Sequence, residues 1–371
     1  MANLEQFDRT IEGALGKRIV GTAILVAIDG KIVYRGVKGF LDREAGTSMR
    51  EDAIFRLASV TKPMAAATAL ALMERGKLGL DDPVTRYLPD FRPRLADGRA
   101  PDILIRHLLT HTSGLGYPTI EPNDAYVALG ISGGLDEPGR GMEDTLRRLV
   151  QAPLYFAPGT AWRYGMSIDV LGAIVARIHG GTLEEAVAHY VTKPLGMSDT
   201  AFRATDRARL AVPYGDGSPA PVRMGDPHSV PDGTRFSPGR ILDETSFQSG
   251  GAGMAGTAGD FLKFLEAIRI GGSAILKRET VAMATKNQIG DLPREEKDAG
   301  KRFGFLSAVL ADPAAAGSPQ PVGTLEWGGA WGHYWFVDPV ARMSVAAFTN
   351  TAMEGCTGPF TKEIRDALYR S

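Results

Sequence analysis

Cysteine is nearly absent from this sequence, and neither sign of charge is in excess. Cys356 is the single cysteine among 371 residues, so no intrachain disulfide can form. It sits in a glycine-rich turn with no histidine nearby, and we expect an ordinary thiol rather than a nucleophile. The 42 Lys and Arg residues are matched by 43 Asp and Glu residues. Such a balance exerts no long-range attraction on phosphate backbones or anionic lipids, so nucleic acid and membrane surfaces are not expected partners.

Long hydrophobic runs and cofactor motifs are also missing. No stretch approaches the roughly 20 apolar residues of a membrane span, and residues 1–8 lack the basic and apolar regions of a secretory signal. We therefore expect a cytoplasmic protein. The six histidines form no metal-binding motif, although His107 and His111 lie four residues apart. The glycines of segment 250–253 lack the flanking strand and Lys-Ser or Lys-Thr pair of a phosphate loop, so we expect neither metal nor cofactor.

What is present is the composition of an ordinary globular protein, because 44% hydrophobic and 23% charged residues allow a sizeable core. Strands are predicted near both ends of the chain, where β-branched runs flank the hairpin signal Asp29-Gly30. The middle has helical periodicity interrupted by Pro- and Gly-rich connectors. We predict helices over 4–16, 59–75, 103–109, 143–149, 167–178, 183–191, 258–268, 277–285 and 361–369, and strands over 19–28, 31–37, 304–310, 331–337 and 343–349.

This order of elements predicts an α/β (α+β) fold, with an antiparallel sheet built from both ends of the chain and flanked by helices. We expect an α/β domain from residues 1–80 and 255–371. A mostly helical domain with long loops is expected from residues 81–254. Within it, residues 205–245 are rich in Pro, Gly and Asp and are predicted to form a long ordered loop.

The first chemical candidate is the segment 59–62, which has the pattern S-x-x-K. Residues three apart share a helix face, so Ser59 Oγ and the Lys62 ammonium can meet. Pro63 clashes with a helical carbonyl four residues back, so the helix can hardly begin before Ser59. Ser59 is therefore expected at a helix N-terminus, where its free N–H and the positive helix end suit a developing oxyanion.

Taken alone, this motif has a second explanation, in which Ser59 is a helix N-cap and Lys62 a solvated surface charge. The surroundings favour the functional explanation. Residues 55–62 closely resemble the nucleophile region of class C β-lactamases and of family VIII carboxylesterases, and further stretches resemble the same superfamily in the same order. These stretches are Leu108–Leu115, Pro158–Tyr164, Pro194–Met197 and Gly250–Met254. The resemblance implies a β-lactamase/transpeptidase-like fold over about residues 20–350.

By this resemblance Tyr164 is the third catalytic residue. A phenol, with an ordinary pKa of about 10, acts as a base only where a nearby cation stabilises its phenolate. Lys62 would be that cation. Whether Tyr164 or Lys62 takes the proton of Ser59 stays open, and an aromatic packing residue is the alternative interpretation of Tyr164.

Two departures from the β-lactamase pattern point toward ester hydrolysis. Met166 stands where β-lactamases have an Asn that orients the substrate amide, and a thioether cannot replace that hydrogen bond. The segment Trp327-Gly328-Gly329 resembles the W-G-G variant of family VIII carboxylesterases, and its glycines are expected on an edge strand that substrate approaches closely. The resemblance implies that the N–H of Ala330 is the second oxyanion donor. A tryptophan in place of a cation favours neutral substrates, although it is also typical of a buried core.

Three other residues need an interpretation. Ser132 lies in a G-x-S-x-G pattern, but loop-forming residues follow it where that motif needs a helix, so we do not expect a nucleophile there. His333 follows the W-G-G segment closely and is a weaker candidate for the pocket lining. Asp169, one helical turn beyond Tyr164, is expected to favour its helix N-terminus rather than to tune the site.

Together these features predict a serine carboxylesterase that hydrolyses short-to-medium acyl esters through a Ser59 acyl-enzyme, with weak β-lactam hydrolysis at most. Small-molecule esters are the expected partners, and the sequence does not determine the oligomeric state. The alternatives are an acyltransferase that uses the same Ser-Lys-Tyr site, a D-amino-acid amidase or peptidase, and a non-catalytic relative that binds ligand. Ser59, Lys62 and Tyr164 are all intact, which disfavours the last of these.

Overall fold

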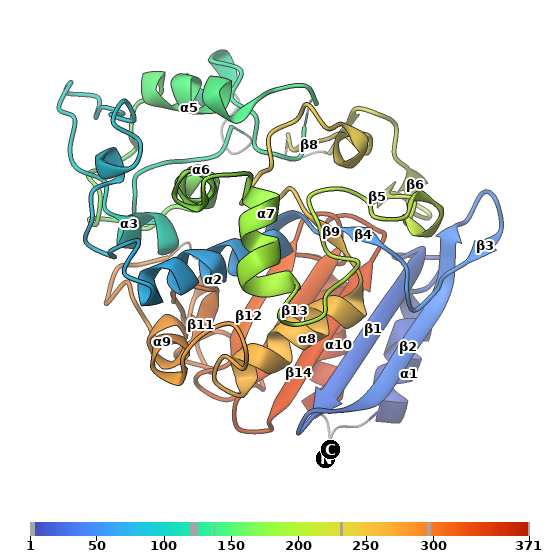
Figure 1. The fold of residues 1–371 in the computed structure, drawn as a ribbon. Coiled ribbons are helices and arrows are strands. Elements are labelled where there is room, and N and C mark those ends of the chain that lie inside the picture. The colour runs from blue at the N-terminus through green and yellow to red at the C-terminus, as the bar shows by residue number, and fades with distance from the viewer. Residues whose placement is uncertain (1–3, 119–124, 137, 231–232, 295–297, 370–371) are drawn as a thin grey trace.

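The molecule is built around one antiparallel sheet whose strands come from both ends of the chain (Figure 1). The computed structural model describes residues 4–118, 125–136, 138–230, 233–294 and 298–369. The helices are α1 (Leu4–Ala14), α2 (Thr61–Glu74), α3 (Ile105–Leu109), α4 (Ala125–Ala128), α5 (Met142–Gln151), α6 (Ser167–His179), α7 (Leu183–Val187), α8 (Ala258–Arg269), α9 (Arg278–Ala284) and α10 (Pro359–Tyr369). The strands are β1 (Gly21–Ile28), β2 (Lys31–Asp42), β3 (Thr47–Ser48), β4 (Phe55–Arg56), β5 (Tyr214–Gly215), β6 (Val222–Arg223), β7 (His228–Ser229), β8 (Arg235–Phe236), β9 (Ala255–Gly256), β10 (Lys301–Phe303), β11 (Ala308–Leu310), β12 (Leu325–Gly329), β13 (His333–Asp338) and β14 (Met343–Thr349).

The main sheet has eight strands in the order β10-β11-β12-β13-β14-β1-β2-β3. β1 and β2 form the hairpin predicted at Asp29-Gly30, where both residues have positive φ. β1 then pairs with β14, with Thr22 opposite Thr349, so the first and last strands of the chain meet in the middle of the sheet. The predicted antiparallel sheet, built from both ends of the chain and flanked by helices, is therefore confirmed.

Both faces of the sheet are covered, which explains why β1 is buried along almost its whole length and is mostly apolar. Alternate residues of a strand point to opposite faces. Ala23 and Leu25 pack into the large core on the side of α2 and α8, whereas Ile24 and Val26 pack into a second core with α1 and α10. Figure 1 shows α8 crossing one face of the sheet.

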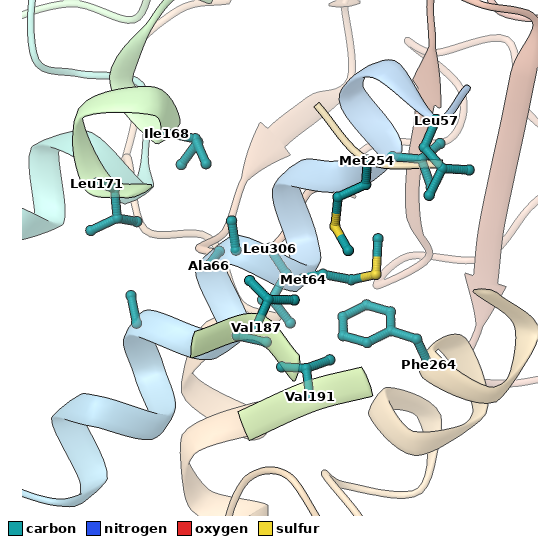
Figure 2. Close-up of a cluster of buried hydrophobic side chains, with 14 of the residues drawn as sticks. Leu57, Met64, Ala66, Ile168, Leu171, Val187, Val191, Met254, Phe264 and Leu306 are labelled. Atoms are coloured by element: carbon teal, nitrogen blue, oxygen red, sulfur yellow. The ribbon is translucent and has the colours of Figure 1, made fainter. Parts of the chain in front are cut away.

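Helix α2 runs through the centre of the large core. Its residues from Thr61 to Leu72 are all buried, and a helix that is apolar on every side is typical of the interior. Figure 2 shows Met64 and Ala66 of α2 among side chains from both parts of the molecule, including Ile168 of α6 and Phe264 of α8. This packing fixes the start of α2, and thus Ser59 and Lys62, against the rest of the fold.

The start of α2 differs slightly from the expectation. Residues Ala58–Val60 form a 3₁₀ turn, and the α-helix begins at Thr61. Ala58, just before Ser59, has φ of +46°, a left-handed conformation that costs an L-residue about 1 kcal/mol. Strain of this kind is typical of functional sites, where surrounding structure holds it in place.

Three further predictions need correction. The run 304–310 is not one strand, because Gly304 N donates to Ser307 O in a turn that separates β10 from β11. The W-G-G segment is not on an edge strand, since β12 lies between β11 and β13. The predicted loop 205–245 contains the short pairs β5–β6 and β7–β8.

The described part of residues 81–254 carries α3 to α7 and these short strand pairs, and no strand of the main sheet. The division into two domains stays a prediction. None of the helices in the described ranges combines the length and the apolar character that crossing a membrane would require.

Candidate active site

Ser59, Lys62 and Tyr164 meet in one hydrogen-bonded cluster. Lys62 Nζ donates to Ser59 Oγ at 3.1 Å, across the three-residue spacing expected from the sequence. Tyr164 Oη, from the loop before α6, donates to the same Oγ at 2.7 Å. Ser59 and Tyr164 are partly exposed, while Lys62 is buried. The hydroxyl of this partly exposed serine is thus held between an amine and a phenol.

The Lys62 ammonium has further partners that hold it in place. It donates to the carbonyl of Gly251 at 2.8 Å. It also lies 4.6 Å from the centre of the Tyr164 ring and 5.4 Å from that of Tyr117, within the range of cation–π attraction. Both phenol rings therefore lie beside one buried cation.

Trp327 joins this cluster in a way that the sequence did not indicate. Its Nε1 donates to Tyr164 Oη at 3.3 Å, and the ring centres lie 5.2 Å apart. The indole is therefore more than an apolar wall. A cation also lies near this ring. The guanidinium carbon of Arg294 is 5.5 Å from the centre of the Trp327 ring and 4.4 Å from that of the Trp162 ring.

The glycines of β12 allow that strand to lie against the turn that carries Ser59. A Cβ on Gly329 would lie 2.3 Å from Leu57 O, a distance that real side chains do not adopt. A Cβ on Gly328 would lie 2.9 Å from Cys356 Sγ, so the lone thiol packs against the same strand. Burial raises the pKa of Cys356 to about 12, which keeps it a neutral thiol.

Ala330 follows β12 directly. Among the described residues its N–H has no backbone hydrogen-bond partner, and its role as an oxyanion donor stays a prediction. The first N–H groups of the 3₁₀ turn at Ser59 also lack partners within that turn.

Sequence reasoning missed two aromatic neighbours of Tyr164. The His111 ring centre lies 4.8 Å from that of Tyr164, and the Tyr117 ring centre lies 5.4 Å from it. Burial, with Lys62 and Arg294 nearby, lowers the pKa of His111 well below its ordinary value, so this histidine is neutral. Burial likewise raises the pKa of Tyr117. His111 belongs to a stretch that resembles the superfamily, but no spacing rule points to either ring.

Asp169 does more than favour its helix N-terminus, which corrects the expectation. It is fully buried in the first turn of α6. Its Oδ1 accepts hydrogen bonds from Ser249 Oγ and, at 3.1 Å, from Gly251 N. Burial raises the pKa of the Asp169 carboxyl, while the Lys62 charge and these hydrogen bonds oppose that effect. The residue thus holds the loop whose carbonyl contacts Lys62.

Met166 and His333, which we expect to line the site, are both fully buried. Met166 caps α6, and its side chain is fully buried in the large core. His333 is also fully buried, on β13 opposite Gly329, and its Nε2 donates to Arg56 O at 2.7 Å. Both lie close in sequence to residues of the cluster, but their side chains point into the core.

The competing motifs have structural explanations. Ser132 Oγ donates to Asp136, and neither a strand before it nor a helix after it is present among its described neighbours. His107 Nδ1 accepts from Leu104 N at the start of α3, while His111 Nδ1 accepts from Gly165 N at 3.4 Å. The two histidines therefore have different partners.

A hollow beside Lys62 has mostly apolar walls, including Leu109, Phe303 and Trp327. A second pocket is lined by Ala252 and Trp331, which follow Gly251 and Ala330 directly in the sequence.

Comparison with known proteins gives a consistent result. A family model described as Beta-lactamase matches residues 7–359. The esterase EstB of Burkholderia gladioli is 51% identical over 98% of this chain and 94% of its own length. An acyltransferase, calJ of Penicillium decumbens, is 31% identical over 85% of this chain and 80% of its own length. A solved structure described as EstCE1, a hydrolase with promiscuous acyltransferase activity, superposes with a TM-score of 0.95 at 41% identity, covering 99% of this chain and 98% of the other.

Proposed function

Because this chain belongs to the Beta-lactamase family, we propose that it is a serine carboxylesterase with Ser59 as its nucleophile. One observation carries the proposal: Ser59 Oγ is within hydrogen-bond reach of both Lys62 Nζ, at 3.1 Å, and Tyr164 Oη, at 2.7 Å. A serine is a weak nucleophile until a neighbouring group accepts its proton. Here the Lys62 amine and the Tyr164 hydroxyl, either of which can accept a proton when deprotonated, flank the oxygen of a partly exposed serine.

The proposed reaction is acyl transfer in two steps. Ser59 Oγ attacks the ester carbonyl while its proton passes to whichever member of the Lys62–Tyr164 pair is deprotonated, the Lys62 amine or the Tyr164 phenolate. The N–H groups of Ser59 and Ala330 hold the oxyanion of the tetrahedral intermediate. The carbon–oxygen bond to the alcohol then breaks, and the proton goes to the departing alcohol through Tyr164. Water cleaves the acyl-enzyme by the reverse sequence of proton transfers.

Neutral acyl groups suit the apolar side chains beside the cluster, and the notion that they are short to medium in length is part of this proposal. The hollow beside Lys62 has apolar walls apart from Lys62 itself and the neutral His111. In the β-lactamase pattern, the position of Trp327 holds a cation that would attract a substrate carboxylate. The indole N–H of Trp327 instead donates to Tyr164 Oη. Weak β-lactam turnover is compatible with the Ser-Lys-Tyr cluster. The preference for esters over β-lactams is argued from Trp327 alone, because the side chain of Met166 is buried.

Transfer of the acyl group to an alcohol is the second candidate activity. It is favoured by the acyltransferase activity named for EstCE1 and for calJ, and it needs no further residue.

A cytoplasmic location also remains a prediction.

The test is hydrolysis of p-nitrophenyl acetate, butyrate and octanoate, with nitrocefin alongside, by the wild type and by Ser59→Ala. We expect turnover of the shorter esters, poor turnover of nitrocefin, and loss of all of it in Ser59→Ala. Ser132→Ala is the matched control, since it removes the other candidate serine, and it should keep wild-type activity. Adding a primary alcohol and measuring the ester formed then gives the ratio of transfer to hydrolysis.

Two results would contradict the proposal. Preference for nitrocefin would mean that the Trp327 argument is wrong. Esterase activity retained in Ser59→Ala would place the nucleophile elsewhere.

A further inference from the structure

The loop around Gly251 is fastened to α6 by a buried carboxylate that no step of the proposed reaction uses. Asp169 Oδ1 accepts from Ser249 Oγ and from Gly251 N, and the carbonyl of that same Gly251 accepts from Lys62 Nζ. A chain of hydrogen bonds therefore runs from α6 through the loop to the amine that contacts Ser59.

Both glycines of this loop are needed for its close contact with α6. A Cβ on Gly250 would lie 2.5 Å from Ile168 O, and a Cβ on Gly251 would lie 2.5 Å from Asp169 Oδ2. The loop backbone thus lies directly on the first turn of the helix. This contact explains why two successive glycines stand at this point of the chain.

Asp169 is not fully satisfied, which is unusual for a buried charge. Its Oδ2 is buried without a hydrogen-bond partner, and its carboxylate forms no ion pair with any described residue. A buried polar atom without a partner in the protein is uncommon and needs an explanation. The cations that act on it through space are Lys62 and Arg240.

We propose that Asp169 is a positioning residue for Lys62: it holds in place the loop whose Gly251 carbonyl accepts from the ammonium. The ammonium then stays aligned with Ser59 Oγ while the proton moves. This inference rests on the proposed function, and it assigns to Asp169 no contact with substrate.

Asp260 is a matched control within the same chain. Like Asp169, it is buried, is the third residue of its helix, and accepts one backbone N–H and one hydroxyl, from Asp199 at 2.8 Å and Thr200 at 3.2 Å. Its ion pair is with Lys263 on the same helix. It has no bond to the cluster around Ser59, so its substitution reports the cost of losing a buried aspartate near a helix start.

The experiment compares Asp169→Ala, Asp169→Asn and Asp260→Ala as full chains, with kcat, KM and Tm measured on p-nitrophenyl butyrate. Asp169→Ala should lower kcat about 100-fold, because the loop carbonyl is released and misplacement by about 1 Å has effects of that size. Asp169→Asn keeps an oxygen acceptor but removes the charge, so it should recover part of the loss, to about tenfold below wild type. KM should stay within about threefold in both variants. Asp260→Ala should lower Tm with kcat nearly unchanged.

Equal kcat in Asp169→Ala and Asp260→Ala, or a loss confined to KM, would overturn the assignment. If Asp169→Ala does not fold, Ser249→Ala removes one donor to the same oxygen and should lower kcat several-fold, and an unchanged kcat there overturns it as well. Failure of the proposed function is recognised separately, by activity that survives in Ser59→Ala.

Discussion

The two sides of the site are built by different means. On the sheet side, β12 and the Ser59 turn meet through backbone, and Gly329 allows this because a Cβ there would lie 2.3 Å from Leu57 O. On the helical side, side chains do the positioning, through Tyr164, Asp169 and the rings around Lys62. The sheet side therefore depends on the absence of side chains, and the helical side on buried polar contacts. Substitutions should affect the two sides differently.

The largest effect is expected on the helical side, from Tyr164→Phe. This change removes the hydroxyl that contacts Ser59 Oγ at 2.7 Å and accepts from Trp327 Nε1, while the ring stays. Loss of a group that carries the proton should lower kcat/KM by about 10²–10⁴-fold. Tyr155→Phe is the control, since the buried Tyr155 hydroxyl has no hydrogen-bond partner within the described ranges of the chain, and its removal breaks none of the hydrogen bonds seen there. Equal activities in the two variants would show that the phenol does not take part.

On the sheet side, His333 should make stability depend on pH. Burial lowers the pKa of His333 to about 4 from an ordinary value of about 6.5, so the folded state disfavours its protonation. The contribution to stability is full above about pH 6.5 and is lost as the pH falls toward 4, by up to about 3 kcal/mol. Unfolding free energies measured by urea from pH 7 to pH 4 should decline less in His333→Gln than in the wild type. Parallel curves would contradict this assignment.

Gly329→Ala should disturb the sheet side selectively. The added methyl would push β12 away from Leu57 and shift the Ala330 N–H, which should lower kcat about 100-fold. Gly259→Ala is the control, because its Cβ would meet only ordinary contacts of 3.8 Å near the start of α8. That variant should keep full activity with Tm unchanged or raised. If Gly329→Ala kept wild-type kcat, backbone contact would not be what positions the sheet side.

The smallest effect is expected from Met166→Asn, which restores the β-lactamase residue beside Tyr164. Met166 is fully buried in the core, so the amide would lie among apolar side chains. We expect a loss of about 2 kcal/mol in unfolding free energy and no gain in nitrocefin turnover. A clear gain in nitrocefin turnover would mean that this side chain reaches the substrate after all.

Contacts between residues close in sequence could be predicted for this molecule, whereas contacts between distant residues could not be derived from local pattern. The Ser59–Lys62 pair follows from helical spacing, and the hairpin of β1 and β2 follows from Asp29-Gly30. Tyr164 was found by resemblance, because nothing local indicates that a residue 105 positions away contacts Ser59. The strand predicted over 304–310 was wrong because Gly304 turns the chain.

Two features of the site cannot be predicted from the sequence: the role of a backbone carbonyl and the direction in which a side chain points. The Gly251 carbonyl is a backbone group, and every residue has one, so no residue type marks its role. Met166 and His333 show the opposite error, since closeness in sequence does not decide which way a side chain points. Met166 turns into the core as α6 begins, and His333 fills the space beside Gly329.

The most direct test of the central claim is covalent labelling with a fluorophosphonate, followed by intact-protein mass measurement. The account predicts one adduct per chain in the wild type and in Ser132→Ala, and none in Ser59→Ala. An adduct of equal extent in Ser59→Ala would contradict the assignment of Ser59 as the nucleophile.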